Sequence, residues 1–222
     1  SKLRLDEEVR DIYEALERAK MREQFEIIPQ WATRDSDLIH ALVKHKPQIV
    51  HFSGHGVGDG GLALENDSGQ THIVSTEALT QLFKLFKDKI NCILLNACYS
   101  EALALAIHQH INYVIGMNQT IGDRAAIKFA GAFYQGLCNE LSIEDAYELG
   151  RIAIQLAGIP ESLTPVIKIR PNLPVEAQPF TKREQEHKPE ETSPFSNLFN
   201  ISNSNIKNVL GSGTINYQES SR

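Results

Sequence analysis

Short apolar runs alternate with longer amphipathic segments along most of this chain, and this alternation constrains the fold more than any other feature. The runs QIVHFS, NCILLNA and YVIGM begin at residues 48, 91 and 113. A strand that is apolar throughout is typical of a parallel sheet covered on both faces, and parallel strands need a helical crossover between them. The pattern therefore predicts a three-layer α/β/α sandwich with a mainly parallel sheet.

The predicted helices show apolar residues at helical spacing or begin at a residue that can cap a helix. Asp35, Asp123 and Ser142 are expected to cap their helices, and Ser75 or Thr76 opens another. The expected helices span 5–20, 35–44, 75–86, 100–110, 123–138 and 142–156. The expected strands span 25–31, 48–53, 91–97, 113–117 and 165–169, with two short strands around a turn within 61–74.

The composition changes after Ile169, where the pattern of a packed core ends. Five of the nine prolines lie between residues 171 and 194, together with many Glu and Lys residues. Such a segment cannot bury a core. We therefore predict a folded domain over 1–169, a linker over 170–194 and a flexible Asn/Gly-rich tail over 195–222.

The tail contains two short β-prone arms around Gly211-Ser212-Gly213, within residues 205–217. Low charge, many Asn residues and no Pro are typical of segments that stack as cross-β structure. Two interpretations stay open, a disordered tail and a homotypic assembly motif within residues 200–217. In the second, stacking of the tails would bring the preceding domains of several copies together.

Charge and cysteine content narrow the class of protein. The net charge of −6 and a pI near 5.8 argue against a nucleic-acid partner, which needs clustered Lys and Arg. No apolar run approaches the roughly 18 residues of a membrane span. Three cysteines outside metal-ligand spacing suit free thiols in the cytoplasm. Because the chain begins with Ser1 rather than Met, we expect it to be a piece of a larger protein.

Two of the predicted strands end in residues that can carry chemistry. His55 follows the first apolar run in a glycine-rich turn, and Cys98 follows the second, just before a helix opened by Ser100. Carboxyl ends of parallel strands form the ligand site of such sheets. An imidazole there can deprotonate a thiol and later protonate a leaving amine. Gly56 has no side chain, so its N–H, together with that of Cys98, is a candidate oxyanion hole.

Other interpretations of the same residues have weaker support. Cys92 and Cys138 are expected to be buried small apolar residues. The glycines at 56, 58 and 61 match a dinucleotide-binding spacing, but the following LAL segment predicts a strand rather than the required helix. No phosphate-binding G-K-[ST] motif is present. His51 and His55 are not placed on one helix face, so no metal site is predicted.

The motifs HFSGHG and LNACYS, with His55 and Cys98 43 positions apart, resemble the caspase and haemoglobinase superfamily of cysteine peptidases. Among its branches, the chain is most similar to the bacterial CHAT domains of the cyanobacterial type. The segments LRLDEEVRDI, STEALTQLF, VIGMNQTIGDRAA and GIPESLTP also resemble CHAT sequences. The resemblance covers roughly residues 3 to 167 and implies a caspase-like sheet.

The resemblance also implies roles for individual residues. His55 is the general base, Cys98 the nucleophile, and Gly56 an oxyanion-hole donor. Relatives that cleave after Lys or Arg often carry an acidic residue two positions before the cysteine, where this chain has Asn96. Asp123 is the remaining acidic candidate for substrate binding, unless it serves only as a helix cap. The family's first strand, which precedes the LRLDEE segment, is absent, so the sheet is expected to be open or incomplete.

The function predicted from the sequence is a cysteine endopeptidase that needs no cofactor and cleaves a protein substrate. The resemblance places it in bacterial stress, defence or cell-death signalling. The alternative is a catalytically inactive CHAT-type scaffold or adaptor module. The presence of both His55 and Cys98 favours the enzyme.

Overall fold

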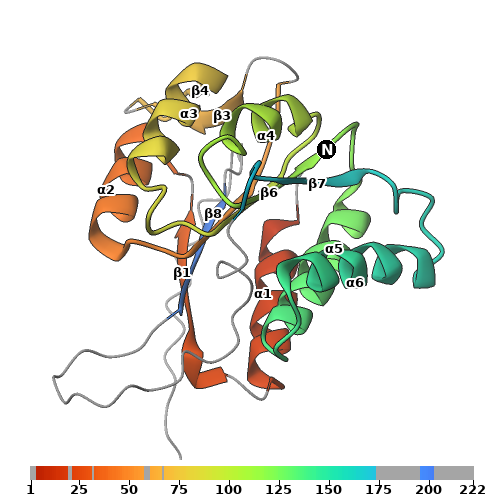
Figure 1. Ribbon diagram of the computed structural model, residues 1–222. Coiled ribbons are helices and arrows are strands. Elements are labelled where there is room, and N and C mark those ends of the chain that lie inside the picture. The colour runs from red at the N-terminus through yellow and green to blue at the C-terminus, as the bar shows by residue number, and fades with distance from the viewer. Residues whose placement is uncertain are drawn as a thin grey trace, which may run out of the picture.

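The computed structural model describes residues 4–19, 22–31, 33–57, 61–66, 68–173 and 196–202. Six strands form one sheet in the order β1-β8-β2-β5-β6-β7 (Figure 1). All neighbouring strands are parallel except the β6–β7 pair. The strands are β1 (Phe25–Trp31), β2 (Ile49–Ser53), β5 (Cys92–Asn96), β6 (Tyr113–Met117), β7 (Pro165–Ile169) and β8 (Ser196–Ser202). The prediction of an α/β fold with a mainly parallel sheet is confirmed.

Each face of the sheet is covered by a separate layer, which makes the three layers of the sandwich. On one side lie α1 (Leu5–Glu17), α5 (Asp123–Leu137) and α6 (Ile143–Leu156). On the other side lie α2 (Asp35–His45), α3 (Thr76–Leu85), α4 (Glu101–Ile107) and a hairpin of β3 (Leu62–Glu65) and β4 (Thr71–Val74). A short 3-10 turn, η1 (Arg22–Gln24), precedes β1. No helix in these described ranges is long and apolar enough to cross a bilayer.

Strand β5 shows why the apolar runs fold as central strands. Cys92 and Leu94 point into the core beneath α1, α5 and α6, while Ile93 and Leu95 point into the core on the opposite face. All four side chains are fully buried. Because successive side chains of a strand point to opposite faces, only a strand covered on both sides needs an unbroken apolar run.

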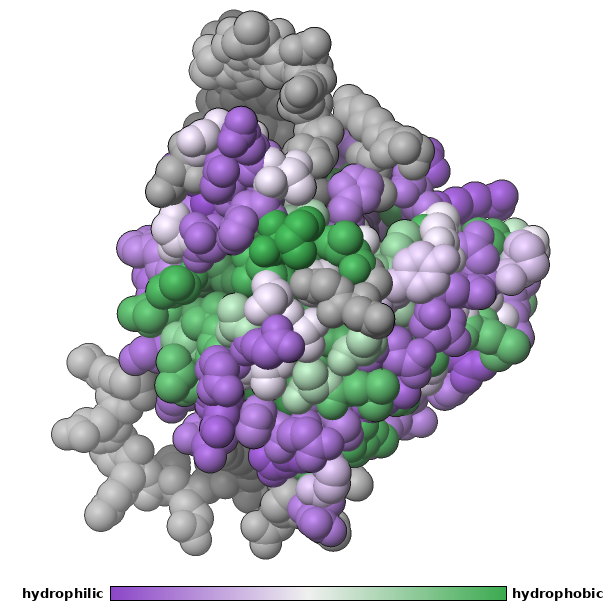
Figure 2. Space-filling view, turned by 90° about the horizontal axis from the view of Figure 1, so that it is seen from above, coloured by the Kyte–Doolittle hydropathy of each residue, from purple (hydrophilic) through white to green (hydrophobic). Residues whose placement is uncertain are grey.

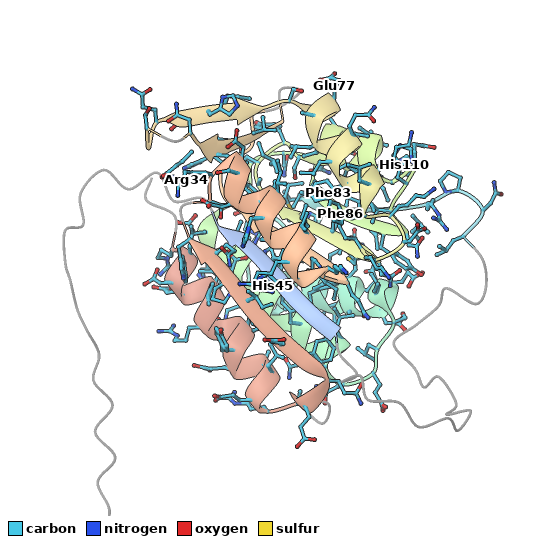
Figure 3. All side chains as sticks on the ribbon, turned by 90° about the vertical axis from the view of Figure 1, so that its left-hand side faces the viewer. Arg34, His45, Glu77, Phe83, Phe86 and His110 are labelled. Carbon is cyan, nitrogen blue, oxygen red and sulfur yellow. The ribbon has the colours of Figure 1, made fainter. Side chains whose placement is uncertain are left out.

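Helix α3 covers part of the core on the side of the sheet that also holds α2 and α4. Phe83 and Phe86 lie toward the C-terminal end of this helix (Figure 3). Phe83 is 2% exposed within this core, and Phe86 packs against its edge. Ser75 caps the helix by accepting a hydrogen bond from the backbone N–H of Ala78. The predicted start of this helix is therefore confirmed, and α3 packs its apolar stripe against the sheet.

Three other residues were predicted to cap helices, and the prediction is confirmed for one of them and wrong for two. Ser142 caps α6 by accepting from the N–H of Asp145. Asp35 does not cap α2, because the N-cap is Arg34, whose own N–H donates to Asp37 at 3.1 Å. Asp35 is instead the first helical residue, where its negative charge still favours the helix dipole. The second wrong cap, Asp123, lies in the candidate site.

The described strands form one unbroken sheet from β1 to β7, and the missing first strand of the family stays a prediction. Strand β8 lies between β1 and β2 and is parallel to both, with Ser196–Ser202 opposite Phe25–Trp31. Strand β1 is an outer strand, as Pro29 indicated. The boundaries 1–169, 170–194 and 195–222 stay predictions. Most of the predicted linker, and residues 203–217 of the segment predicted as a disordered tail or an assembly motif, lie outside the described residues.

Candidate active site

His55 and Cys98 follow two neighbouring strands at the same edge of the sheet. Strands β2 and β5 are parallel, and their last residues, Ser53 and Asn96, are register partners. Each of the two candidate residues lies two positions beyond its strand. The N–H of Gly54 donates to the carbonyl of Asn96 at 3.3 Å, which joins the two chain segments beyond the last strand pair. Both His55 and Cys98 line one pocket of about 290 Å³.

The pocket lies at the carboxyl edge of the parallel strands, where the first turn of α1 also lies. Figure 2 looks onto this edge from above and shows hydrophobic residues between hydrophilic ones. The pocket is lined from α1 and its approach, from the ends of β2 and β5, and from the β6–α5 loop with the start of α5. Its lining residues are Arg4, Leu5, Glu8, Ser53, Gly54, His55, Asn96, Ala97, Cys98, Thr120, Ile121, Gly122, Asp123, Ala126 and Ile127.

Of the three cysteines, Cys98 is the only one with an accessible thiol. Cys92 and Cys138 are 0% exposed, and burial raises the pKa of both thiols, that of Cys138 to about 12. These two are therefore inert core residues, as expected. Cys98 is partly exposed, and its Sγ lies 3.9 Å from the carbonyl oxygen of Ile121 in the pocket wall.

The turn that presents Cys98 has an unusual backbone. Tyr99 has a φ of +56°, the left-handed region that a bulky residue seldom adopts. Ser100 is the N-cap residue of α4, but its hydroxyl does not cap the helix. It donates to the carbonyl of Leu95 at 3.0 Å and accepts from the N–H of Met117 at 2.9 Å. The turn after Cys98 is thus anchored to β5 and β6.

Gly56 lies against the backbone of Cys98. A Cβ at this position would lie 2.0 Å from the carbonyl oxygen of Cys98 and 3.3 Å from its nitrogen. Gly56 also forms an antiparallel bridge with Leu62. The hydrogen bonds of this bridge are made by the residues on either side of the pair, from the N–H of Val57 to Gly61 and from the N–H of Ala63 to His55. The bridge therefore leaves the N–H of Gly56 unused. The missing side chain is required for close packing of the two loops, and the N–H stays a candidate oxyanion donor.

Substituting Gly56→Ala is expected to impair the site severely. The added methyl group would overlap a backbone atom, which cannot rotate away, so the His55 and Cys98 loops must move apart. A displacement of about 1 Å at reacting groups can cost about 100-fold in rate. Peptide-cleavage kcat/KM of the variant measures the loss.

The matched control for this substitution is Gly69→Ala, at a hairpin position where nothing lies within 4 Å of the added Cβ. That variant should retain activity, although its φ of +69° costs some stability. Wild-type activity in Gly56→Ala would contradict the close packing.

Beneath the two candidate residues lies a buried cluster centred on Glu8 of α1. The Glu8 carboxylate is 3% exposed. It accepts a short hydrogen bond from the Ser53 hydroxyl and one of 2.6 Å from the Asn96 amide. Nε2 of the fully buried His51 lies 3.1 Å from Oε1 of Glu8. Helix α1 is therefore tied to the ends of the two strands that carry His55 and Cys98.

The Glu8 carboxylate is held in its ionised form by these contacts. Burial by itself raises the pKa of Glu8, but the nearby His51 ring and the hydrogen bonds from His51, Ser53 and Asn96 outweigh burial. The net result is a pKa below the ordinary value of 4.5. The cluster thus places a buried carboxylate, paired with the His51 ring, directly beside the pocket.

Comparisons with known proteins support the family suggested by the two motifs. The CHAT domain family model matches residues 3–157, which include both HFSGHG and LNACYS. The chain belongs to the CHAT domain family. A Roc-COR-CHAT protease from an unknown prokaryotic organism is 31% identical over 125 residues, which are 54% of this chain and 12% of the relative. A protein described as a probable protease from Gillisia limnaea is 26% identical over 136 residues, 60% of this chain and 24% of the relative.

These relatives are much longer than the matched region. The chain spans about an eighth of one and a quarter of the other. The comparisons therefore describe this domain and not the remaining parts of the longer relatives.

The CHAT domain brings all the residues singled out from the sequence to one place, though not all in the expected way. His55, Cys98, Asn96 and Asp123 line the pocket, and Gly56 packs beside it. Asp123 is the first residue of α5 rather than its cap. The N-cap is Gly122, which makes no side-chain cap and donates its N–H to Glu161 at 2.6 Å. The capping interpretation of Asp123 is therefore wrong.

Sequence reasoning missed Glu8, Ser53 and His51. A weak signal for Glu8 exists, because it lies three positions after Leu5 and four before Ile12, on the apolar face of α1. A charged residue on such a face requires a buried partner. The chain alone did not show which residues would be that partner.

Proposed function

We propose that this CHAT domain is a cysteine endopeptidase that cleaves a protein substrate. His55 would act as general base and Cys98 as nucleophile. The observation that carries the proposal is that two adjacent parallel strands deliver an imidazole and the one accessible thiol into the same pocket. The printed names of the two relatives, both proteases, support the same class of reaction.

The chemistry follows from the groups around the pocket. His55 accepts the thiol proton, and the Cys98 thiolate attacks the carbonyl carbon of the scissile peptide bond. The N–H of Gly56 would stabilise the resulting oxyanion, since such a donor contributes about 3 kcal/mol in other enzymes. The imidazolium then protonates the leaving amine as the C–N bond breaks. Water, deprotonated by His55, hydrolyses the thioester and restores the free thiol.

The biological setting belongs to the same proposal. We place the peptidase in the cytoplasm, in a bacterial stress, defence or cell-death response, as the CHAT resemblance implies. Assembly through residues 200–217 would then concentrate the peptidase domains. The alternative, an inactive CHAT scaffold, requires neither an accessible thiol nor a histidine beside it.

Alkylation of Cys98 provides the test of this proposal. Iodoacetamide at neutral pH is expected to modify one cysteine per chain, because the pKa values of Cys92 and Cys138 are raised by burial. Peptide mapping should locate the label on Cys98. The rate at which the protein cleaves a mixed peptide library should fall in proportion to the fraction of Cys98 that is labelled.

The outcomes separate the enzyme from the scaffold. Cleavage that persists after complete labelling of Cys98 would exclude a Cys98-dependent peptidase. A protein that is labelled at Cys98 but cleaves no peptide in the library would favour the scaffold. Cys138→Ala serves as the control, since it should label and cleave as the wild type does.

A further inference from the structure

The antiparallel strand β7 brings a second loop to the edge of the sheet where Cys98 lies. Its first residue, Pro165, is the register partner of Met117, the last residue of β6. The loop before β7 (residues 157–164, the support loop) therefore ends at the carboxyl edge of the parallel strands. There it meets the loop after β6 (residues 118–122, the wall loop), which lines part of the pocket.

The wall loop holds the turn that carries Cys98. The carbonyl of Gln119 accepts a hydrogen bond of 3.3 Å from the N–H of Tyr99. The carbonyl of Ile121 lies 3.9 Å from Sγ of Cys98. Because Tyr99 has a φ of +56°, its backbone conformation persists only where the surrounding structure holds it. The position of the thiol therefore depends on the position of the wall loop.

The wall loop is in turn held by the support loop, through hydrogen bonds that Glu161 and Thr164 accept. The Glu161 carboxylate accepts from the N–H of Gly122 at 2.6 Å, at the start of α5. The carbonyl of Thr164 accepts from the N–H of Asn118 at 3.0 Å. The hydroxyl of Thr164 accepts from the side-chain amide of Gln119 at 3.0 Å. Both ends of the wall loop are thus fastened to the support loop.

The support loop is anchored to the body of the domain. Thr164 is 0% exposed. The guanidinium of Arg151 donates to the carbonyl of Ser162 at 2.9 Å. Just beyond the loop, the hydroxyl of Tyr147 donates to the carbonyl of Pro165 at 2.8 Å. Both donors come from α6, which packs into the core beneath the sheet, so the support loop is a fixed point for the wall loop.

Resting on the proposed peptidase function, we propose that Glu161 and Thr164 are positioning residues that orient the Cys98 thiol through the wall loop. Neither residue belongs to the described lining of the pocket, so they act on the thiol rather than on the substrate. A displacement of about 1 Å at reacting groups can cost about 100-fold in rate. Loss of either anchor should therefore slow the chemical step and leave substrate binding almost unchanged.

The first readout separates kcat from KM for a fluorogenic peptide. Glu161→Ala removes the acceptor of the Gly122 N–H and is expected to lower kcat at least about tenfold, with KM within about twofold of the wild type. Glu161→Gln keeps an acceptor oxygen and should restore most of kcat. Glu77→Ala, the same change at an exposed residue of α3 (Figure 3), should leave kcat and KM unchanged.

Thr164 provides a second pair of variants. Thr164→Val removes the hydroxyl with little change of shape and leaves the side-chain amide of Gln119 without its acceptor. It is expected to lower kcat in the same way, and Thr164→Ser, which keeps the hydroxyl, should restore it. Should Glu161→Ala fail to fold, as judged by circular dichroism, this pair decides instead. Equal kcat values for the Val and Ser variants would then contradict the positioning role.

The second readout needs no peptide cleavage. Tyr99 is hydrogen-bonded to Gln119 and not to Glu161, so its N–H reports whether the anchor acts through the wall loop. Glu161→Ala is expected to speed hydrogen exchange of the Tyr99 amide at least about tenfold, measured by NMR. Glu77→Ala should leave this rate unchanged. Faster exchange at Gly122 alone, with Tyr99 protected as in the wild type, would show a purely local role and overturn the inference.

Failure of this inference and failure of the peptidase proposal give different results. A wild type that cleaves peptides, with unchanged kcat in Glu161→Ala, would overturn the positioning role and leave the peptidase intact. A lower stability of Glu161→Ala with unchanged kcat would likewise show a structural role only. A wild type that cleaves no peptide, with a Tyr99 amide that Glu161→Ala releases, would overturn the peptidase and keep the coupling between the two loops.

Discussion

Replacing Cys98 with alanine is expected to lower kcat/KM for peptide cleavage by about 10⁴-fold or more, because the variant has no nucleophile. His55→Ala should cost a similar factor, since the thiol then lacks a base and the leaving amine lacks an acid. Residues that act as one unit are not additive. The double variant is therefore expected to be no slower than the slower single variant. Progress curves with a fluorogenic peptide at matched protein concentrations measure all three.

The control for these variants is Cys138→Ala, which makes the same change at a cysteine in the core. Cys138 is fully buried on the α5 side of the sheet, so this variant should lose stability rather than activity. Activity in Cys98→Ala within tenfold of the wild type would contradict the assignment of the nucleophile. Additive losses in the double variant would contradict a shared role of His55 and Cys98.

Replacing Glu8 with alanine is expected to lower the free energy of unfolding by about 3–5 kcal/mol. The substitution leaves three buried polar groups, on Ser53, His51 and Asn96, without their common acceptor. It also opens a void between α1 and the ends of β2 and β5. Urea denaturation followed by circular dichroism measures the change. Glu7→Ala, which removes only a surface ion pair, should cost less than about 1 kcal/mol.

The pH dependence of the same pair of proteins gives an independent check. Glu8 has a pKa below its ordinary value of 4.5 in the folded protein. Its contribution to stability is therefore complete above the unfolded pKa and is lost as pH falls through the folded one. The stability difference between wild type and Glu8→Ala should narrow as pH falls below 4.5. A difference that stays constant into strong acid would show that Glu8 is not ionised in the fold.

The parts of the site that could be predicted are those encoded by short stretches of sequence. The positions of His55 and Cys98 could be predicted because each follows a short apolar run, and such a run forms a buried strand more readily than any other structure. The same runs predicted the parallel sheet and both of its covering layers. The prediction that the two residues meet at one site then followed from the general rule that ligand sites lie at the carboxyl edge of such sheets.

The parts that could not be predicted depend on contacts between distant segments. The hydrogen bond from Asn96 to Glu8 joins residues 88 positions apart and requires the register of β2 and β5 as well as the docking of α1. The sequence therefore did not show that Asn96 is a buried partner of Glu8. The caps expected at Asp35 and Asp123 failed differently, because a helix boundary shifted by one residue leaves the local pattern almost unchanged. No local signal connects Ser196–Ser202 with the gap between β1 and β2.

The complete burial of β5 and β6 has a consequence for how accurately the thiol is held. Every residue of both strands is buried, and Ser100 hydrogen-bonds to both just beyond Cys98. Segments with many buried apolar contacts open only when the whole molecule unfolds, whereas exposed loops fluctuate separately. Cys98 is thus attached to strands whose backbone amides are expected to exchange hydrogen most slowly. Strand β2, which precedes His55, is also buried at every residue, so the same class of structure supports both members of the pair.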